Sequence, residues 1–247
     1  AIGGNFNIGT TTTSANVDLA GAVSVDGLIS ITGQVVTIGG AVRADANSAA
    51  NESLTISATH TAASDLNVNN TLTTNTGAIT LSAKDDIIFA AAGDLASNNG
   101  NVLVTADSDN TAAGSGGVIT MADGTTINAG SGTITLSADE NIALGGLTTT
   151  NATGTAVSIT SDNGSITDTG NTDVEITALS ANSVVTLTAK DAIGTVSGDS
   201  VYLDPADTGY AGNPLETAML TASITTSAVN SDIAIDNTSS GGLTISA

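Results

Sequence analysis

The stretch Ile79–Ala83, with the sequence Ile-Thr-Leu-Ser-Ala, returns unchanged at Ile134–Ala138 and as Val-Thr-Leu-Thr-Ala at 185–189. Successive side chains of a β-strand point to opposite faces, so the two aliphatic residues of each copy share one face and the hydroxyl residues the other. A short strand that recurs along the chain is typical of repeat folds, in which each repeat packs on the next. The phrase therefore predicts stacked strands with one apolar face.

The spacing of these phrases defines a larger unit. Positions that begin a phrase recur after 55 residues in the pairs Ile79 and Ile134, Val102 and Val157, and Ile119 and Val174. Residues 77–131 and 132–186 are therefore interpreted as two copies of a 55-residue unit with three phrases each. One phrase per coil gives about 18–20 residues per coil of an all-β parallel β-solenoid.

The alternation also predicts which side chains face the core. The predicted inward stack consists of Ile79, Val102, Ile119, Ile134, Val157 and Val174. The predicted outward column consists of Thr80, Leu103, Thr120, Thr135, Ser158 and Glu175. Asn, Asp and Gly cluster between the phrases, where the corners of a coil need residues that tolerate positive φ.

Composition excludes several classes of protein. The chain has 247 residues, 24 acidic residues, three basic ones and a net charge of −21, which argues against nucleic-acid binding. It has no cysteine, so disulfide scaffolds and cysteine-ligated metal sites are excluded. No run of 18 apolar residues occurs, and no membrane insertion is expected. Only 2% of the residues are aromatic, so the core must consist of small aliphatic side chains.

The solenoid is predicted to occupy 1–203 and to resume at 220–247. Between them, 204–219 contains both prolines of the chain and is interpreted as a loop excursion or joint, because proline cannot donate to a strand ladder. Within it, Asn213 as N-cap, Pro214 at the first position and Glu216 at the third suit a short helical turn. A long surface loop is the alternative.

The phrases Gly77-Ala78-Ile79-Thr80-Leu81-Ser82-Ala83, Gly132-Thr133-Ile134-Thr135-Leu136-Ser137-Ala138 and 241–247 resemble the repeats of filamentous-haemagglutinin-like proteins and giant bacterial β-strand-repeat surface adhesins. The similarity covers about 15–203 and 220–247. The resemblance implies a right-handed parallel β-helix, export through the outer membrane, and a role as an adhesin shaft or extracellular fibre. It implies no catalytic residues.

Calcium is the ligand hypothesis that the residues favour. Asp107 and Asp109, and separately Asp168 and Asp173, place carboxylates at alternate or near positions, as hard cations require. Aspartates that cap the turns of a coil are the alternative. No cofactor is required, and no catalytic residue is assigned. His60, the only histidine, has no serine context typical of a triad, and Lys84 is replaced by Asp139 in the next copy.

Paired hydroxyl residues raise a second hypothesis, a carbohydrate-, calcium- or ice-binding solenoid. Pairs of the form Thr-x-Thr or Thr-x-Ser begin at Thr55, Thr80, Thr135, Thr186 and Thr244. In the predicted register the array is interrupted by the pairs Leu103/Thr105, Thr120/Ala122 and Glu175/Thr177, which argues against a continuous binding face. A polysaccharide lyase or hydrolase is the third hypothesis, and no sequence motif supports it.

The function that the sequence favours is structural and not enzymatic: a rigid acidic rod at the bacterial cell surface or outside the cell. Its expected partners are further copies of itself, stacked head to tail, or flanking repeats of a longer chain; surface glycans are a further hypothesis. The predicted self-assembly interface lies at the two ends and consists of Ile2, Phe6, Ile8, Leu243 and Ile245.

Overall fold

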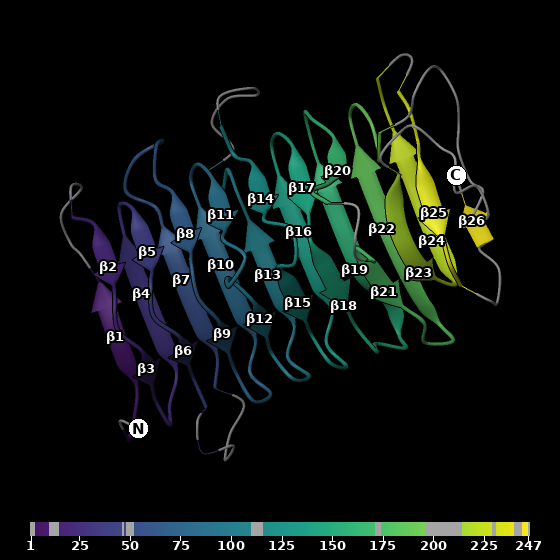
Figure 1. The fold of residues 1–247 in the computed structure, drawn as a ribbon. Helices are drawn as coiled ribbons and strands as arrows, with labels where there is room; N and C mark the ends of the chain where they lie inside the picture. The colour runs from purple at the N-terminus through teal and green to yellow at the C-terminus, as the bar shows by residue number, and fades with distance from the viewer. Residues whose placement is uncertain are drawn as a thin grey trace.

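The chain winds into a parallel β-helix with three faces (Figure 1). The computed structural model describes residues 3–9, 15–45, 47, 52–109, 116–170, 174–195, 214–228, 231–239 and 244–246. All regular elements of these residues are strands, and every strand pairs in parallel with its equivalent in the next coil. The predicted all-β parallel solenoid is therefore confirmed.

The strands of successive coils form three sheets, with ten, seven and nine strands among the described residues. The first sheet contains β1 (Phe6–Gly9), β4 (Ile29–Gly33), β7 (Leu54–Ala58), β10 (Ile79–Ala83), β13 (Val102–Thr105), β16 (Ile134–Ala138), β19 (Gly154–Ser161), β22 (Ser183–Ala189), β24 (Thr221–Thr226) and β26 (Thr244–Ser246). The second contains β2 (Val17–Leu19), β5 (Val36–Ile38), β8 (Leu66–Val68), β11 (Ile87–Phe89), β14 (Ile119–Met121), β17 (Ile142–Leu144) and β20 (Ile166–Asp168). The third contains β3 (Val23–Ser24), β6 (Val42–Arg43), β9 (Leu72–Thr73), β12 (Leu95–Ala96), β15 (Thr126–Asn128), β18 (Gly146–Thr148), β21 (Ile176–Ala178), β23 (Leu215–Met219) and β25 (Ile235–Asn237).

The core is a set of aliphatic ladders that run along the helix axis. Ile79 of β10 pairs with Leu54 on one side and Val102 on the other, and all three are buried. Thr80, the next residue, is half-buried on the outer face, as the alternation predicts. Burying one aliphatic side chain contributes about 1.5–3 kcal/mol to the stability of the folded state. The many aliphatic side chains buried in successive coils therefore supply the stabilisation that aromatic residues give to other cores.

The coils are longer than predicted. Ile79 pairs with Val102, Val102 with Ile134, and Ile134 with Val157, so successive coils take 23, 32 and 23 residues. The expected 18–20 residues per coil is wrong, and the 55-residue unit corresponds to two coils instead of three. The cause is Ile119, which begins a second-sheet strand and pairs with Ile87 and Ile142.

This register also corrects the predicted stacks. Five members of the inward stack are buried, although Ile119 belongs to another sheet, while Val174 is 38% exposed. Among the outward residues, Thr120 lies in the second sheet and Glu175 is buried at 2% exposure. Glu175 lies at the corner directly before β21, in which Ile176 and Ala178 are buried. Alternation would turn Glu175 outward even in this strand, but it does not hold at the corner, where the side chain is buried.

The predicted excursion at 204–219 ends earlier than expected. Leu215–Met219 is strand β23, which pairs with β21 and β25, and the proposed helical turn that begins at Asn213 is therefore wrong. Leu215, Thr217 and Met219 are buried, so the alternation of this segment placed it in the sheet despite the proline before it. Residues 196–213 lie outside the described residues.

Glycines at one corner allow successive coils to touch through their backbones. A Cβ added to Gly77, Gly100 or Gly132 would lie 2.0 or 2.1 Å from the carbonyl oxygen of the preceding coil, which is Glu52, Gly77 and Gly100 in turn. No side chain fits at such distances. These three residues, called the glycine column below, explain why the strand phrases begin with glycine.

A second column of corner residues adopts positive φ. Asp45, Asn98 and Gly130 have φ values of 54°, 53° and 56°, in the left-handed region that Gly, Asn and Asp tolerate. The Asn98 side chain uses this position to donate from Nδ2 to the carbonyl of Thr74, 2.9 Å away. Asp45 is fully buried, and neither of its carboxylate oxygens has a hydrogen-bond partner among the described residues.

Replacing Asp45 by asparagine is expected to stabilise the protein by about 1–2 kcal/mol, because an unpartnered buried carboxylate is exchanged for a neutral amide of the same shape. The amide also tolerates the positive φ. Denaturant unfolding of the two proteins measures the difference. Asp26→Asn, at the neighbouring and more exposed corner, is the control and is expected to change stability by less than about 0.5 kcal/mol. An Asp45→Asn protein no more stable than the wild type would contradict this account.

Candidate functional site

The four predicted calcium ligands do not form one site. Asp107 and Asp109 lie at the corner after β13, and the Asp109 carboxylate forms an ion pair of 3.2 Å with Lys84. Asp168 ends β20, which lies two strands beyond β14 in the second sheet, and β14 is the strand that follows Asp107 and Asp109 along the chain. Asp173 lies outside the described residues. The predicted pairs therefore belong to different corners, and Asp109 is neutralised by the protein's own lysine.

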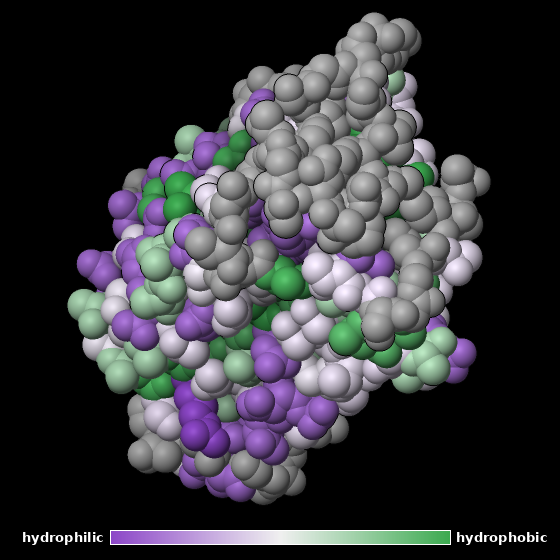
Figure 2. Space-filling model, turned by 45° about the vertical axis from the view of Figure 1, so that its right-hand side comes forward, coloured by the Kyte–Doolittle hydropathy of each residue, from purple (hydrophilic) through white to green (hydrophobic). Residues whose placement is uncertain are grey.

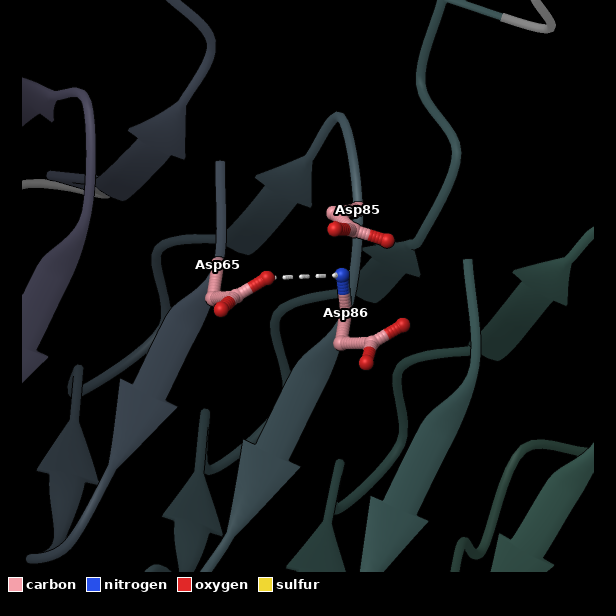
Figure 3. A group of neighbouring side chains, drawn as sticks. All are labelled: Asp65, Asp85 and Asp86. Carbon is pink, nitrogen blue, oxygen red and sulfur yellow. Dashed lines mark hydrogen bonds between the residues drawn. The ribbon is translucent and has the colours of Figure 1, made fainter. Parts of the chain in front are cut away.

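A cluster of three carboxylates, here called the corner cluster, lies beside this ion pair (Figure 3). Asp65 precedes β8, while Asp85 and Asp86 join β10 to β11, and their carboxylate oxygens lie within 4.8 Å of one another. The Asp65 Oδ1 accepts the backbone N–H of Asp86 at 3.4 Å. Sequence reasoning did not select these residues, although two adjacent aspartates after a repeated strand phrase were a signal for an acidic corner.

The negative charges of the corner cluster favour the binding of a proton or a cation. Partial burial, followed by the charges of Asp86 and Asp65, raises the pKa of Asp85. Asp86 is held as an acceptor, because its Oδ1 receives the N–H groups of Gly117 and Val118, each at 3.0 Å. Three carboxylates at such separations match the oxygen donors that hard cations use.

A shallow acidic pocket lies on the neighbouring coils of the same edge. It encloses about 200 Å³ and is lined by Thr105, Ala106, Asp107, Ser137, Ala138, Asp139 and Asp162. Asp139 is only 6% exposed, and its Oδ1 accepts a hydrogen bond of 2.6 Å from Asn163 Nδ2. Acidic residues thus follow this edge of the rod over several successive coils.

A more deeply buried acidic cluster, here called the inner cluster, lies between the second and third sheets near the C-terminal end. Its members Asp168, Glu175 and Glu216 have carboxylate oxygens within 4.8 Å of one another. Burial, the Asp168 charge and the hydrogen bond to Glu216 raise the pKa of Glu175 to about 9. The Glu175 Oε2 also accepts the backbone N–H of Glu216 at 2.8 Å.

The arrangement of the inner cluster indicates a shared proton. Burial also raises the pKa of Glu216, whereas its hydrogen bond with the Glu175 side chain acts in the opposite direction. Glu175 therefore carries the proton near neutral pH and donates it to the Glu216 carboxylate. One predicted ligand, Asp168, belongs to this cluster, but its partners are 7 and 48 positions away along the chain and no local motif connects them.

The residues considered for catalysis are occupied by structural contacts. His60 donates from Nδ1 to the carbonyl of Gly33 at 2.9 Å, which joins adjacent coils. Lys84 binds Asp109, and Lys190 donates from Nζ to Asn163 Oδ1 at 3.2 Å. These contacts place each side chain at a corner between neighbouring coils.

Those residues predicted to mediate self-assembly that the structure describes lie in β1 and β26, the two end strands of the first sheet (Figure 1). Phe6 and Ile8 of β1 pair with Ile29 and Ile31 and pack on the core, but remain half-buried where their partners are buried. Ile245 of β26 pairs with Ala222, while Ile2 and Leu243 lie outside the described residues. Figure 2, which turns the C-terminal end towards the viewer, shows apolar and polar residues interspersed among the coloured residues of this view.

Comparisons with known proteins assign no relative. No family model, curated protein or solved structure matches the chain. Among the described residues, no helix is long and apolar enough to cross a membrane. The class of protein is therefore defined by the fold itself, a three-sided parallel β-helix with acidic corners.

Proposed function

We propose that this protein is a structural rod that lengthens by stacking coil on coil, as the shaft of an adhesin or a fibre at the bacterial cell surface. The observation that carries the proposal is the continuity of the first sheet, in which ten strands pair in register along the axis. Every coil contacts mainly its neighbours, so such a molecule resists bending and can be extended without a new kind of interface.

The geometry of β1 supports addition of a further strand. In a parallel ladder, alternate residues direct their backbone groups to opposite neighbours. Phe6 donates to the carbonyl of Leu28 at 2.9 Å, so Phe6 and Ile8 direct their N–H groups to β4. Asn7 and Gly9 consequently direct theirs away from it, towards the place that a preceding coil would occupy. That coil belongs either to a second copy or to flanking repeats of a longer chain.

Replacing Asn7 by proline is expected to block end-to-end association while leaving the coil stack intact. Proline removes the outward N–H at an edge position where it is tolerated and leaves the bonds to β4 in place. Sedimentation velocity and negative-stain images over a range of protein concentrations measure the length of the particles. Asn7→Ala keeps the N–H and is the matched control, expected to associate like the wild type.

Two results would overturn the assembly proposal: wild-type protein that stays monomeric at every concentration, or Asn7→Pro protein that forms rods of the same length. Each sample is measured with calcium and with a chelator.

We propose that calcium associates with the acidic edge, because the corner cluster brings three carboxylates together in a chain of net charge −21. Neutralising that edge is expected to lengthen the rods by reducing repulsion between copies.

A further inference from the structure

The outer side of the first sheet carries two columns of hydroxyl residues, here called the hydroxyl face. One column is Thr32, Ser57, Ser82, Thr105, Ser137, Thr160, Thr188 and Thr225, with no interruption. The other is Ser30, Thr55, Thr80, Leu103, Thr135, Ser158, Thr186 and Ser223, interrupted by one leucine. Of the other expected interruptions, the pair that begins at Thr120 lies in the second sheet, and Glu175 directly precedes β21 of the third sheet. The array is therefore more regular than the sequence indicated.

The hydroxyl face is uncharged in a strongly acidic protein. None of the ten strands of the first sheet, within the ranges that the structure assigns to them, contains Asp, Glu, Lys or Arg. The outward residues of the other two sheets include Asp18, Arg43 and Glu216. The charged side chains of the described residues therefore lie at the corners and on the other two faces, which favours a neutral partner for the hydroxyl face.

The hydroxyl groups of this face are not used inside the molecule. Hydroxyls at the corners donate to backbone carbonyls: Thr74 to Gly77, Ser97 to Gly100 and Thr149 to Gly132. By contrast, the face hydroxyls between Ser30 and Thr225 make no side-chain hydrogen bond within the described part of the chain. They are half-buried between their ladder neighbours, except Thr225, which is exposed. All are directed outward, so their hydrogen bonds go to whatever lies on the face.

The spacing of the hydroxyls is that of the sheet. Neighbouring coils repeat every ~4.8 Å along the axis, and residues two apart on a strand lie ~6.6 Å apart across it. A rigid two-dimensional lattice of hydroxyls, with threonine methyl groups between them, matches a surface that is neutral, flat, periodic and built of hydrogen-bond donors and acceptors. No described strand of this sheet has an outward aromatic residue, so the face offers no apolar ring on which a sugar could stack.

We propose that the hydroxyl face binds ice, with the two columns of hydroxyls anchoring an ordered layer of water that continues into the crystal. The activity belongs to one molecule and does not depend on end-to-end stacking. Leu103 is 40% exposed in the middle of the otherwise unbroken second column, where it removes one hydroxyl from the lattice. It provides a position at which the proposal predicts a gain of function.

The experiment measures thermal hysteresis and the fraction of fluorescently labelled protein incorporated into a growing ice crystal. Thr135→Lys places a long charged side chain in the centre of the face and is expected to lose most of both activities. Thr120→Lys makes the same change on the outer side of the second sheet and is expected to keep them. Leu103→Thr completes the column and is expected to raise both activities.

Each variant is also made with Asn7→Pro, so that a change in rod length is not mistaken for a change in ice binding. Folding is checked by far-ultraviolet circular dichroism and by the melting temperature. No ice activity in folded wild-type protein would overturn the proposal, as would equal activities for Leu103→Thr and Thr135→Lys. Retention on crystalline cellulose or chitin without incorporation into ice would assign the face to a polysaccharide and reject ice. Neither outcome affects the assembly proposal.

Discussion

Replacing Glu175 by glutamine is expected to make the stability of the C-terminal coils independent of pH between about 4.5 and about 9. In the wild-type protein, the stability of these coils is expected to fall over this range. Below the lower value Glu175 is protonated in both the folded and the unfolded state. Between the two values only the folded state keeps the proton, so unfolding releases it and rising pH favours unfolding. Within this window the free energy of unfolding is expected to fall by up to about 1 kcal/mol for each pH unit.

Amide hydrogen exchange as a function of pH, corrected for the intrinsic rate, measures this effect locally. The reporters are β21 and β23, whose strands hold Glu175 and Glu216 in place. Glu175→Gln keeps the shape of the side chain and is expected to be more stable than the wild type at pH 8. Glu140→Gln, at a surface corner, is the control and should retain the wild-type slope. A wild-type protein equally stable at pH 5 and pH 8 in these strands would show that no proton is held there.

Replacing Gly100 by alanine is expected to destabilise the protein by about 3 kcal/mol, because the new methyl group would lie 2.1 Å from the Gly77 carbonyl oxygen. This steric clash is relieved when the two coils separate at the corner, and that separation stretches the hydrogen-bond ladder between β10 and β13. Chemical denaturation gives the free energy, and hydrogen exchange locates the loosened coils.

Gly21→Ala is the matched control for this substitution. Gly21 also lies at a corner, but a Cβ there has no atom within 4 Å, and its φ is not in the left-handed region. Its expected change is at most about 1 kcal/mol, in the stabilising direction, because alanine restricts the unfolded chain. Similar effects at Gly21 and Gly100 would mean that the coils are not in backbone contact at the glycine column.

The sequence was sufficient for the fold because a two-residue alternation, repeated many times, leaves few arrangements that bury Ile79, Val102 and Ile134 together. It was insufficient for the length of a coil. The phrase at Ile119 has the same alternation as that at Val102, and only the ladder pairing distinguishes a second-sheet strand from a first-sheet one. That single misassignment explains the wrong coil length and the apparent gaps in the hydroxyl face. The burial of Glu175 has a separate cause, because this residue lies at the corner before β21, where strand alternation does not apply.

The candidate sites were less accessible to sequence reasoning for a different reason. The inner cluster joins Asp168, Glu175 and Glu216, which meet only because two coils stack, and neither the length of the intervening segments nor their composition specifies this meeting. The corner cluster was nearer to the predicted residues, because Asp107 and Asp109 occupy the adjacent corner. Pairing of Asp109 with Lys84 depends on coil register, which the sequence alone did not provide.

The unequal lengths of the coils have an evolutionary consequence. Extra residues enter at all three corners, after β6, after β13 and before β23, while the strands on either side keep their register. Duplication of a whole coil therefore adds height to the molecule, whereas insertion at a corner adds a surface loop, and the two kinds of change do not interfere. A lineage can thus vary how far this protein reaches and what it displays through independent mutations.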